Sequence, residues 1–255
     1  MSKKALFFDL DDTLLWDEKS IQTALELTCQ SVDNVDAKVL EDEVRKAARS
    51  HYSGYDVYSF TQMIGINPFE GLWGSFNDEG EKFQELHSII EDYQFKTWQT
   101  ALERVGITDD QLALELKDQF IQQRINSPFL FDDALPILKE LSQSYTLLML
   151  TNGAPSLQNL KLKLTPELVP YFDHIIISGD FGKGKPDVSI FVHALEVANV
   201  KKEDVLMIGD NPQTDILGAN RAGIDSVWLN RFDKPTPPVQ ATHEIKELND
   251  LHKLL

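Results

Sequence analysis

The segment "FFDLDDTLLWD" ends an apolar run in crowded carboxylates, with Asp9 and Asp11 two residues apart. Like charges a few ångströms apart repel by ~4 kcal/mol at an effective dielectric near 20, so such crowding needs a compensating group. A carboxylate can attack phosphorus and form an acyl phosphate. A second carboxyl group nearby can protonate a leaving alcohol and later activate water. This spacing makes Asp9 a candidate nucleophile and Asp11 a candidate general acid and base.

Other polar residues also follow short apolar runs. If these runs are parallel strands, their carboxyl ends meet at one edge of a sheet, where open α/β sheets bind their ligands. Acidic, hydroxyl and lysine side chains would then converge at that edge. The residues are Thr151 and Asn152 after "YTLLML", Lys183 and Lys185 in "GDFGKGKPD", and Asp210 and Asp215 in "GDNPQTD".

The apolar runs themselves predict the fold. We expect buried strands at residues 4–9, 145–152, 174–178, 205–209 and 226–230. Helical patterns lie between the later strands, at residues 133–142, 156–164, 188–198 and 215–222. Strands that alternate with helices form βαβ units and a mostly parallel sheet, so the fold class is α/β.

A long interval separates the first two strands, and it reads almost wholly helical. We predict helices at residues 19–32, 37–52, 83–105 and 109–125, with aromatic-rich loops between the second and third. Residues 16–128 are therefore predicted to form a helical domain inserted into a core made of residues 1–15 and 129–255. Asp12 and Asp17, beside the candidate catalytic pair, are expected to be exposed or structural.

Composition excludes several classes of protein. The formal net charge is -17, whereas a nucleic-acid binder usually presents a basic face, so no nucleic-acid partner is expected. No apolar run reaches 18 residues, and the first one meets Asp9 too early for a signal peptide, so no membrane association is expected. Cys29 is the only cysteine, which rules out an intrachain disulfide. A cytoplasmic location follows as the expectation.

The polar residues together resemble the four motifs of the haloacid dehalogenase (HAD) superfamily, a group dominated by phosphatases. The Asp-x-Asp-x-Thr motif is matched by Asp9, Asp11 and Thr13, and the strand-ending hydroxyl by Thr151. The "KP" context selects Lys185, and the final acidic pair is Asp210 and Asp215. The resemblance implies a Rossmann-like parallel sheet with strand order 5-4-1-2-3, and a helical cap of the C1 type inserted after the first motif.

The resemblance also implies roles for these residues. A Mg²⁺ ion would be held by the side chains of Asp9 and Asp210 and by the backbone carbonyl of Asp11. Thr151, Asn152 and Lys185 would hold the phosphoryl group. Asp215 would contact a metal-bound water or the lysine, or it would simply cap the helix that follows. Charge supports a cation here, because three ionised carboxylates and a phosphate dianion repel one another strongly.

The expected function is hydrolysis of a small phosphorylated metabolite through an aspartyl phosphate, with Mg²⁺ as cofactor. Haloacid dehalogenases keep the nucleophile but lack the second aspartate, so Asp11 argues against that branch. A phosphomutase or phosphotransferase could use the same site. A receiver-like phosphoacceptor module is a further alternative, although receivers are smaller and carry no large insert after the first strand. Candidate substrates are phosphoserine, sugar phosphates, acyl-sugar phosphates and nucleoside monophosphates.

Overall fold

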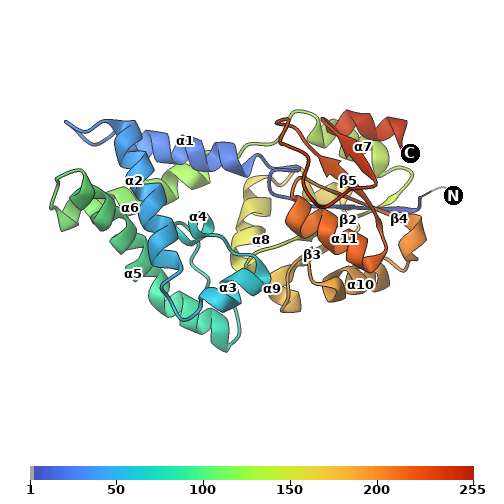
Figure 1. Cartoon of the computed structure of the whole chain (residues 1–255), viewed down its shortest axis with the longest axis horizontal. Coiled ribbons are helices and arrows are strands. Elements are labelled where there is room, and N and C mark those ends of the chain that lie inside the picture. The colour runs from blue at the N-terminus through green and yellow to red at the C-terminus, as the bar shows by residue number, and fades with distance from the viewer. Residues whose placement is uncertain (1–2) are drawn as a thin grey trace. The chain divides into compact units, whose positions relative to one another are not determined.

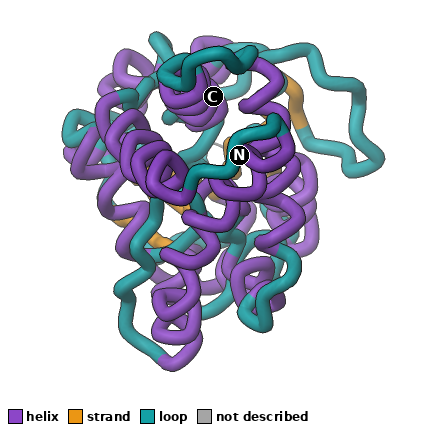
Figure 2. Tube along the Cα trace, turned by 90° about the vertical axis from the view of Figure 1, so that its left-hand side faces the viewer, coloured by secondary structure: helices purple, strands orange, loops and turns teal. Residues whose placement is uncertain are grey.

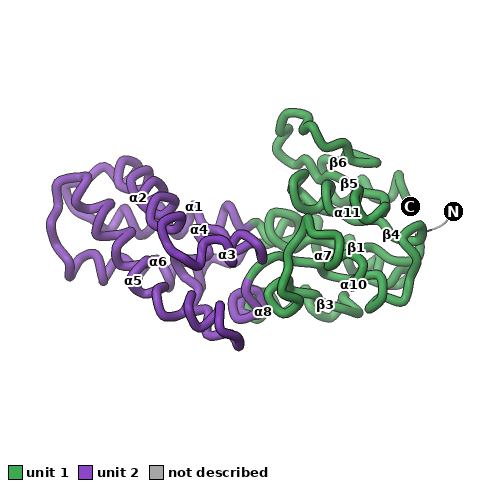
Figure 3. The backbone as a smooth tube through the Cα atoms, turned by 60° about the horizontal axis from the view of Figure 1, so that its bottom comes forward, with its two compact units in different colours: residues 1–16, 130–153, 161–255 green, residues 17–129, 154–160 purple. Residues whose placement is uncertain are grey.

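A computed structural model of the protein describes residues 3–255. Residues 1 and 2, which the sequence assigns to the core, lie outside the described residues. The chain divides into two compact units, shown in different colours in Figure 3. Among the described residues, unit 1 comprises 3–16, 130–153 and 161–255, and unit 2 comprises 17–129 and 154–160.

Unit 1 is built on a six-stranded sheet in which every neighbouring pair is parallel (Figure 1). Its strands are β1 (Ala5–Phe8), β2 (Thr146–Thr151), β3 (His174–Ile177), β4 (Val205–Gly209), β5 (Asp225–Leu229) and β6 (His243–Ile245). Their order is β3-β2-β1-β4-β5-β6. Read from the other edge, this is the expected order 5-4-1-2-3 with β6 added outside β5. The predicted α/β class is confirmed.

Helices pack against both faces of this sheet, and Figure 2 distinguishes the helices, strands and loops of the chain by colour. The helices of unit 1 are α7 (Ala134–Leu141), α9 (Ser178–Phe181), α10 (Val188–Val197), α11 (Leu217–Ala222) and the second half of α8 (Pro155–Leu164). Short helical turns complete it: η1 (Val169–Tyr171), η2 (Lys202–Asp204), η3 (Pro212–Ile216) and η4 (Leu248–Lys253).

The central strand β1 shows why both faces are covered. All four of its residues are buried, and alternate side chains point to opposite faces of a strand. Leu6 and Phe8 join the apolar cluster formed with α7 and η4, whereas Ala5 and Phe7 join the cluster formed with α10 and α11. A strand buried on both sides has no polar positions until it ends, which places its first carboxylate at the edge of the sheet.

Unit 2 is helical. It contains α1 (Asp17–Cys29), α2 (Ala37–Tyr52), α3 (Tyr58–Ile64), α4 (Pro68–Gly71), α5 (Glu81–Arg104), α6 (Asp110–Asn126) and the first half of α8. In that first half, Ser156 donates from its backbone N–H and its hydroxyl to the Asp78 carboxylate of the same unit, both at 2.6 Å. Within residues 3–255, no helix has the length and apolar character needed to span a membrane.

Two short helices of unit 2 differ from the sequence expectation, which made this segment loops. Gly65 adopts a left-handed conformation (φ +83°) that ends α3. Asn67 then starts α4 through a capping box, because its side chain accepts the N–H of Glu70 while the Glu70 carboxylate accepts the N–H of Asn67. These local signals permit helices of one or two turns where periodicity over a longer window predicts none.

A buried ion pair joins the first and last long helices of unit 2. Arg124 of α6 donates to the Asp17 carboxylate at 2.6 Å, and the two side chains are 1% and 9% exposed. The Arg124 guanidinium also lies 4.6 Å from the centre of the Trp73 ring. Asp17 is therefore structural, as expected, but it is buried rather than exposed.

Replacing Arg124 with methionine should strongly destabilise unit 2, because the Asp17 carboxylate would remain buried without its counter-ion. Breaking one side of a buried pair costs about 3–5 kcal/mol. Lys96→Met is the matched control, since Lys96 and Asp92 form a pair in which both side chains are 48% exposed, a type usually worth about 0–1 kcal/mol. Urea unfolding followed by tryptophan fluorescence measures both. Equal losses in the two variants would show that the buried pair does not stabilise the unit.

Candidate active site

The first acidic segment leaves the sheet in a tight loop. The Asp9 N–H donates to the Ile208 carbonyl at 3.0 Å, which keeps Asp9 in register with β4. Beyond it, the N–H groups of Leu14 and Leu15 both donate to the Leu10 carbonyl, at 2.9 and 3.0 Å. Asp12 adopts a left-handed conformation (φ +55°) inside this loop, a conformation that aspartate tolerates better than most residues. The loop turns the chain back within a few residues and leaves Asp9 and Asp11 at the strand end.

A hydroxyl group links this loop to the end of β4. Thr13 is fully buried, and its Oγ1 accepts the backbone N–H of Asp210 at 3.1 Å. The Trp228 indole N–H donates to the Asp210 carbonyl at 3.0 Å. These two bonds fix the backbone on which the Asp210 carboxylate is carried, beside Asp9.

Lys185 lies between two of the predicted acids. Its Nζ is 2.6 Å from Asp9 Oδ1 and 2.7 Å from Asp215 Oδ1, and its side chain is only 2% exposed. Burial alone would lower the pKa of Lys185, but the Asp215 and Asp9 carboxylates outweigh it and raise that pKa above its ordinary value. The lysine is therefore held as a cation. Lys183, the other lysine of this loop, instead pairs with Asp187 at 3.4 Å and is 54% exposed.

Asn152 positions the lysine loop. Its side-chain amide donates to the Lys185 carbonyl at 2.9 Å and accepts the Lys185 N–H at 2.8 Å. Phosphoryl binding by Asn152 stays a prediction; in the structure its amide binds the backbone of Lys185. Thr151, just before it, is fully buried at the end of β2.

Asp9, Asp210 and Asp215 bring carboxylate oxygens within 4.8 Å of one another. Burial, with the Asp215 charge, raises the pKa of Asp9 to about 6 even though Lys185 lowers it. Burial, with the charges of Asp215 and Asp9, raises the pKa of Asp210 well above its ordinary range. Three crowded carboxylates are a donor set that suits a hard divalent cation such as Mg²⁺. These residues therefore fit the metal that the sequence implies.

Asp215 is already engaged through both oxygens. Oδ1 meets Lys185, and Oδ2 accepts the N–H of Asn211 at 3.0 Å. The helix-cap alternative for Asp215 is not what the structure shows, because Asn211 is the residue that caps η3 and its side chain accepts the Gln213 N–H. Asp215 lies inside that turn, where it supports the lysine.

Sequence reasoning missed Lys161. Its Nζ is 2.9 and 3.0 Å from the two carboxylate oxygens of Asp11. A signal was present, since Lys161 stands on the buried stripe of α8 with Leu157 and Leu162, where a helix facing a core carries apolar residues. Lys234, which lies 3.2 Å from Asp210 Oδ2, was also missed, and its proline-rich loop offers no periodic signal.

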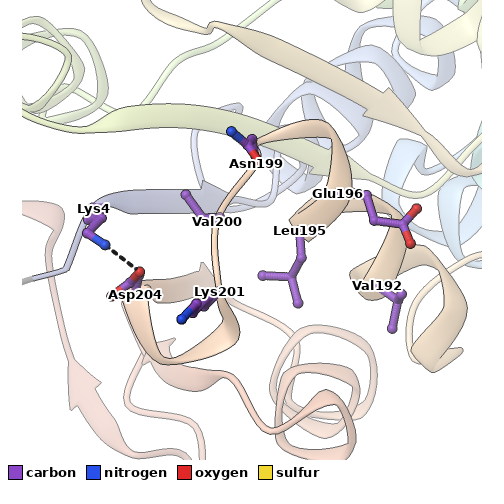
Figure 4. Close-up of a pocket in the computed structure, with 8 residues that line it drawn as sticks. All are labelled: Lys4, Val192, Leu195, Glu196, Asn199, Val200, Lys201 and Asp204. Carbon is purple, nitrogen blue, oxygen red and sulfur yellow. Dashed lines mark hydrogen bonds and ion pairs between the residues drawn. The ribbon is translucent and has the colours of Figure 1, made fainter.

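A cavity of about 410 Å³ lies elsewhere in unit 1 (Figure 4). Lys4 and Asp204, which precede β1 and β4, line it and form an ion pair at 2.8 Å. Because these strands are parallel, the cavity is at the amino edge of the sheet, opposite the carboxyl edge that carries Asp9 and Asp210. It is separate from the candidate active site.

The sequence profile of the haloacid dehalogenase-like hydrolases matches residues 3–223. The chain belongs to this hydrolase family. Within the family, a Thermus thermophilus protein named phosphoserine phosphatase is 33% identical over 238 residues, which cover 92% of each chain. The expected family is thus confirmed.

Solved structures place this HAD-like hydrolase within the same fold. The HAD-hydrolase YfnB of Bacillus subtilis, solved bound to magnesium, is 25% identical, with a TM-score of 0.68 over 100% of this chain and 99% of that one. A 2-haloacid dehalogenase of Pseudomonas syringae is 24% identical, with a TM-score of 0.60 over 100% of this chain and 98% of that one. The second likeness concerns the fold alone.

In this hydrolase, Gly209→Ala should damage the site directly. A Cβ at Gly209, which ends β4, would lie 2.2 Å from Asp215 Oδ2. Asp215 is fully buried, so it can yield only by shifting from its contacts with Lys185 and the Asn211 N–H. We expect about 1–3 kcal/mol of destabilisation and, because misplacement by about 1 Å is costly, a loss of about 10²-fold in hydrolytic rate.

The control for this variant is Gly54→Ala. Gly54 is exposed in unit 2, and its new Cβ would approach no atom closer than 3.3 Å. Thermal unfolding and initial rates should change little in this control. A Gly209→Ala protein with unaltered rate would show that the position of Asp215 is not critical.

Proposed function

We propose that this hydrolase is a Mg²⁺-dependent phosphomonoesterase that acts on small phosphorylated metabolites through an aspartyl phosphate on Asp9. The observation that carries the proposal is the buried Lys185, which bridges Asp9 and Asp215. It provides a fixed positive charge beside the proposed nucleophile. The relative named phosphoserine phosphatase supports phosphate ester chemistry for this family member.

The proposed metal site uses the Asp9 and Asp210 side chains and the backbone carbonyl of Asp11. Both side chains belong to the acidic cluster at the carboxyl edge of the sheet. When bound there, Mg²⁺ would offset the charge of these carboxylates and of the phosphoryl oxygens. Magnesium in the crystal structure of YfnB supports the same cofactor in this chain.

The other catalytic and phosphoryl-binding roles are proposed for individual residues of this chain. Asp9 attacks phosphorus, with its Oδ1 oriented by Lys185. Thr151 and Lys185 bind the phosphoryl oxygens, and Asn152 contributes by fixing the backbone of Lys185. Asp11 donates a proton to the leaving alcohol and then accepts one from the water that hydrolyses the aspartyl phosphate.

We propose that residues 16–128, which make up most of unit 2, act as the cap of this active site, and that residues 1–15 and 129–255 form the core. A helical cap that closes over the site would exclude bulk water and large substrates, which favours metabolites over phosphoproteins. A phosphomutase would use the same residues with a different acceptor. Asp11 favours phosphate ester hydrolysis over dehalogenation, because a departing halide needs no proton.

A panel of phosphorylated metabolites tests the function. Phosphoserine, sugar phosphates, acyl-sugar phosphates and nucleoside monophosphates would be ranked by kcat/KM with Mg²⁺, and again after treatment with EDTA. We expect release of inorganic phosphate with Mg²⁺, loss of at least about 10²-fold with EDTA, and recovery when Mg²⁺ is restored. An unchanged rate in EDTA, or activity on 2-haloacids instead, would overturn the proposal.

Asp9→Asn should abolish turnover of 4-nitrophenyl phosphate, with a loss of at least about 10³-fold, because an amide cannot form the acyl phosphate. The fold should persist, since the change removes a charge from a crowded acidic cluster. Asp12→Asn is the matched control in the same loop, and its left-handed backbone also suits asparagine. Circular dichroism and initial rates would be measured for wild type, Asp9→Asn and Asp12→Asn. An active Asp9→Asn protein would exclude Asp9 as the nucleophile.

A further inference from the structure

We propose that Lys161 is the positioning residue for the acid and base, in that it holds the Asp11 carboxyl group in the orientation needed for proton transfer to the leaving group. This inference rests on the proposed phosphatase function, since it assigns Lys161 a task in that reaction. It concerns a residue that matches none of the four sequence motifs.

Lys161 contacts both carboxylate oxygens of Asp11. Lys161 Nζ lies 2.9 Å from Oδ1 and 3.0 Å from Oδ2 of Asp11. The lysine side chain is 4% exposed, whereas that of Asp11 is 24% exposed. Removing an ammonium group from water costs several kcal/mol unless a charged partner meets it. Asp11 can serve as the charged partner of Lys161 and, because its side chain is partly exposed, can still reach a substrate.

Helix α8 holds the lysine firmly. Leu157 and Leu162 pack on the buried side of the same helix, and the Thr165 hydroxyl donates to the Lys161 carbonyl at 2.9 Å. The helix begins four residues after Thr151, the proposed phosphoryl ligand. Residues 151–161 thus carry both Thr151, the proposed phosphoryl ligand, and Lys161, which orients the Asp11 acid.

An ammonium group suits this task because it has three N–H donors and can follow either oxygen of a carboxyl group. When Asp11 carries the proton on one oxygen, the other oxygen still accepts from Lys161. The carboxyl group then keeps its plane and direction in both halves of the reaction. Positioning of this kind matters because proton transfer to a leaving oxygen needs hydrogen-bond reach and alignment.

The test measures how strongly the rate depends on the leaving group. Lys161→Met would be compared with wild type on 4-nitrophenyl phosphate, phenyl phosphate and phosphoserine, all with Mg²⁺. A nitrophenolate can leave without being protonated, whereas the alkoxide of phosphoserine must receive a proton as it leaves. We expect kcat/KM to fall by about 10²-fold on phosphoserine but by less than about threefold on 4-nitrophenyl phosphate.

Lys163→Met is the matched control, because Lys163 lies on the exposed side of the same helix. It should leave kcat/KM unchanged on all three esters. If Lys161→Met lowers kcat/KM equally on all three esters, or on none, Lys161 does not position the acid and the inference is overturned.

Asp11→Asn serves as the reference variant and separates the two proposals. It should show the same selective loss on phosphoserine. If Asp11→Asn shows no selectivity, the acid role in the proposed function fails. If it shows selectivity and Lys161→Met does not, the present inference alone fails.

The double variant Asp11→Asn/Lys161→Met covers the case in which Lys161→Met does not fold, because it removes both charges of the pair together. Its kcat/KM on phosphoserine should match that of Asp11→Asn within about twofold, since a positioning residue has no effect once the group it positions is gone. A further loss of tenfold or more beyond Asp11→Asn would show an independent role for Lys161 and overturn the inference.

Discussion

A lysine with almost no exposed surface meets two aspartates at the carboxyl edge of the sheet, and much of unit 1 serves to keep it there. An ammonium group buried alone would cost several kcal/mol, and two buried carboxylates without a cation would repel each other. Lys185, Asp9 and Asp215 satisfy one another at 2.6 and 2.7 Å. Loss of Lys185 would leave two buried carboxylates without their shared cation, whereas loss of either aspartate would still leave the lysine one carboxylate partner.

Backbone positions around Lys185, Asp9 and Asp215 leave little room for larger residues. A Cβ on Gly209 would collide with Asp215, and a Cβ on Gly184 would lie 2.8 Å from Asn152 Oδ1. The first glycine allows Asp215 to approach the end of β4. The second allows the Asn152 amide to hold the backbone of Lys185. Gly184 of "GKGKP" and Gly209 of "VLMIG" are thus required by close approach to side chains.

Much of the fold was predictable because strand and helix periodicities are local. The strand order and the meeting of four motifs at one edge follow from short buried runs and a family resemblance. Other contacts depend on residues far apart in the chain, such as Arg124 with Asp17 across 107 positions. No local pattern reports such a partner. The mistaken loop assignment near α3 and α4 has a different cause, since helices of one or two turns depend on caps rather than on a repeating apolar stripe.

The acidic crowding of "FFDLDDTLLWD" is resolved by two lysines rather than one. Lys185 reaches Asp9 across 176 positions, and Lys161 reaches Asp11 across 150. The two pairs differ in exposure. Asp9 is 11% exposed and its lysine also contacts Asp215, whereas Asp11 is 24% exposed. A nucleophile needs a fixed direction, and an acid that later acts as a base needs access to both the leaving group and water. The difference in burial between the two aspartates matches the different tasks proposed for them.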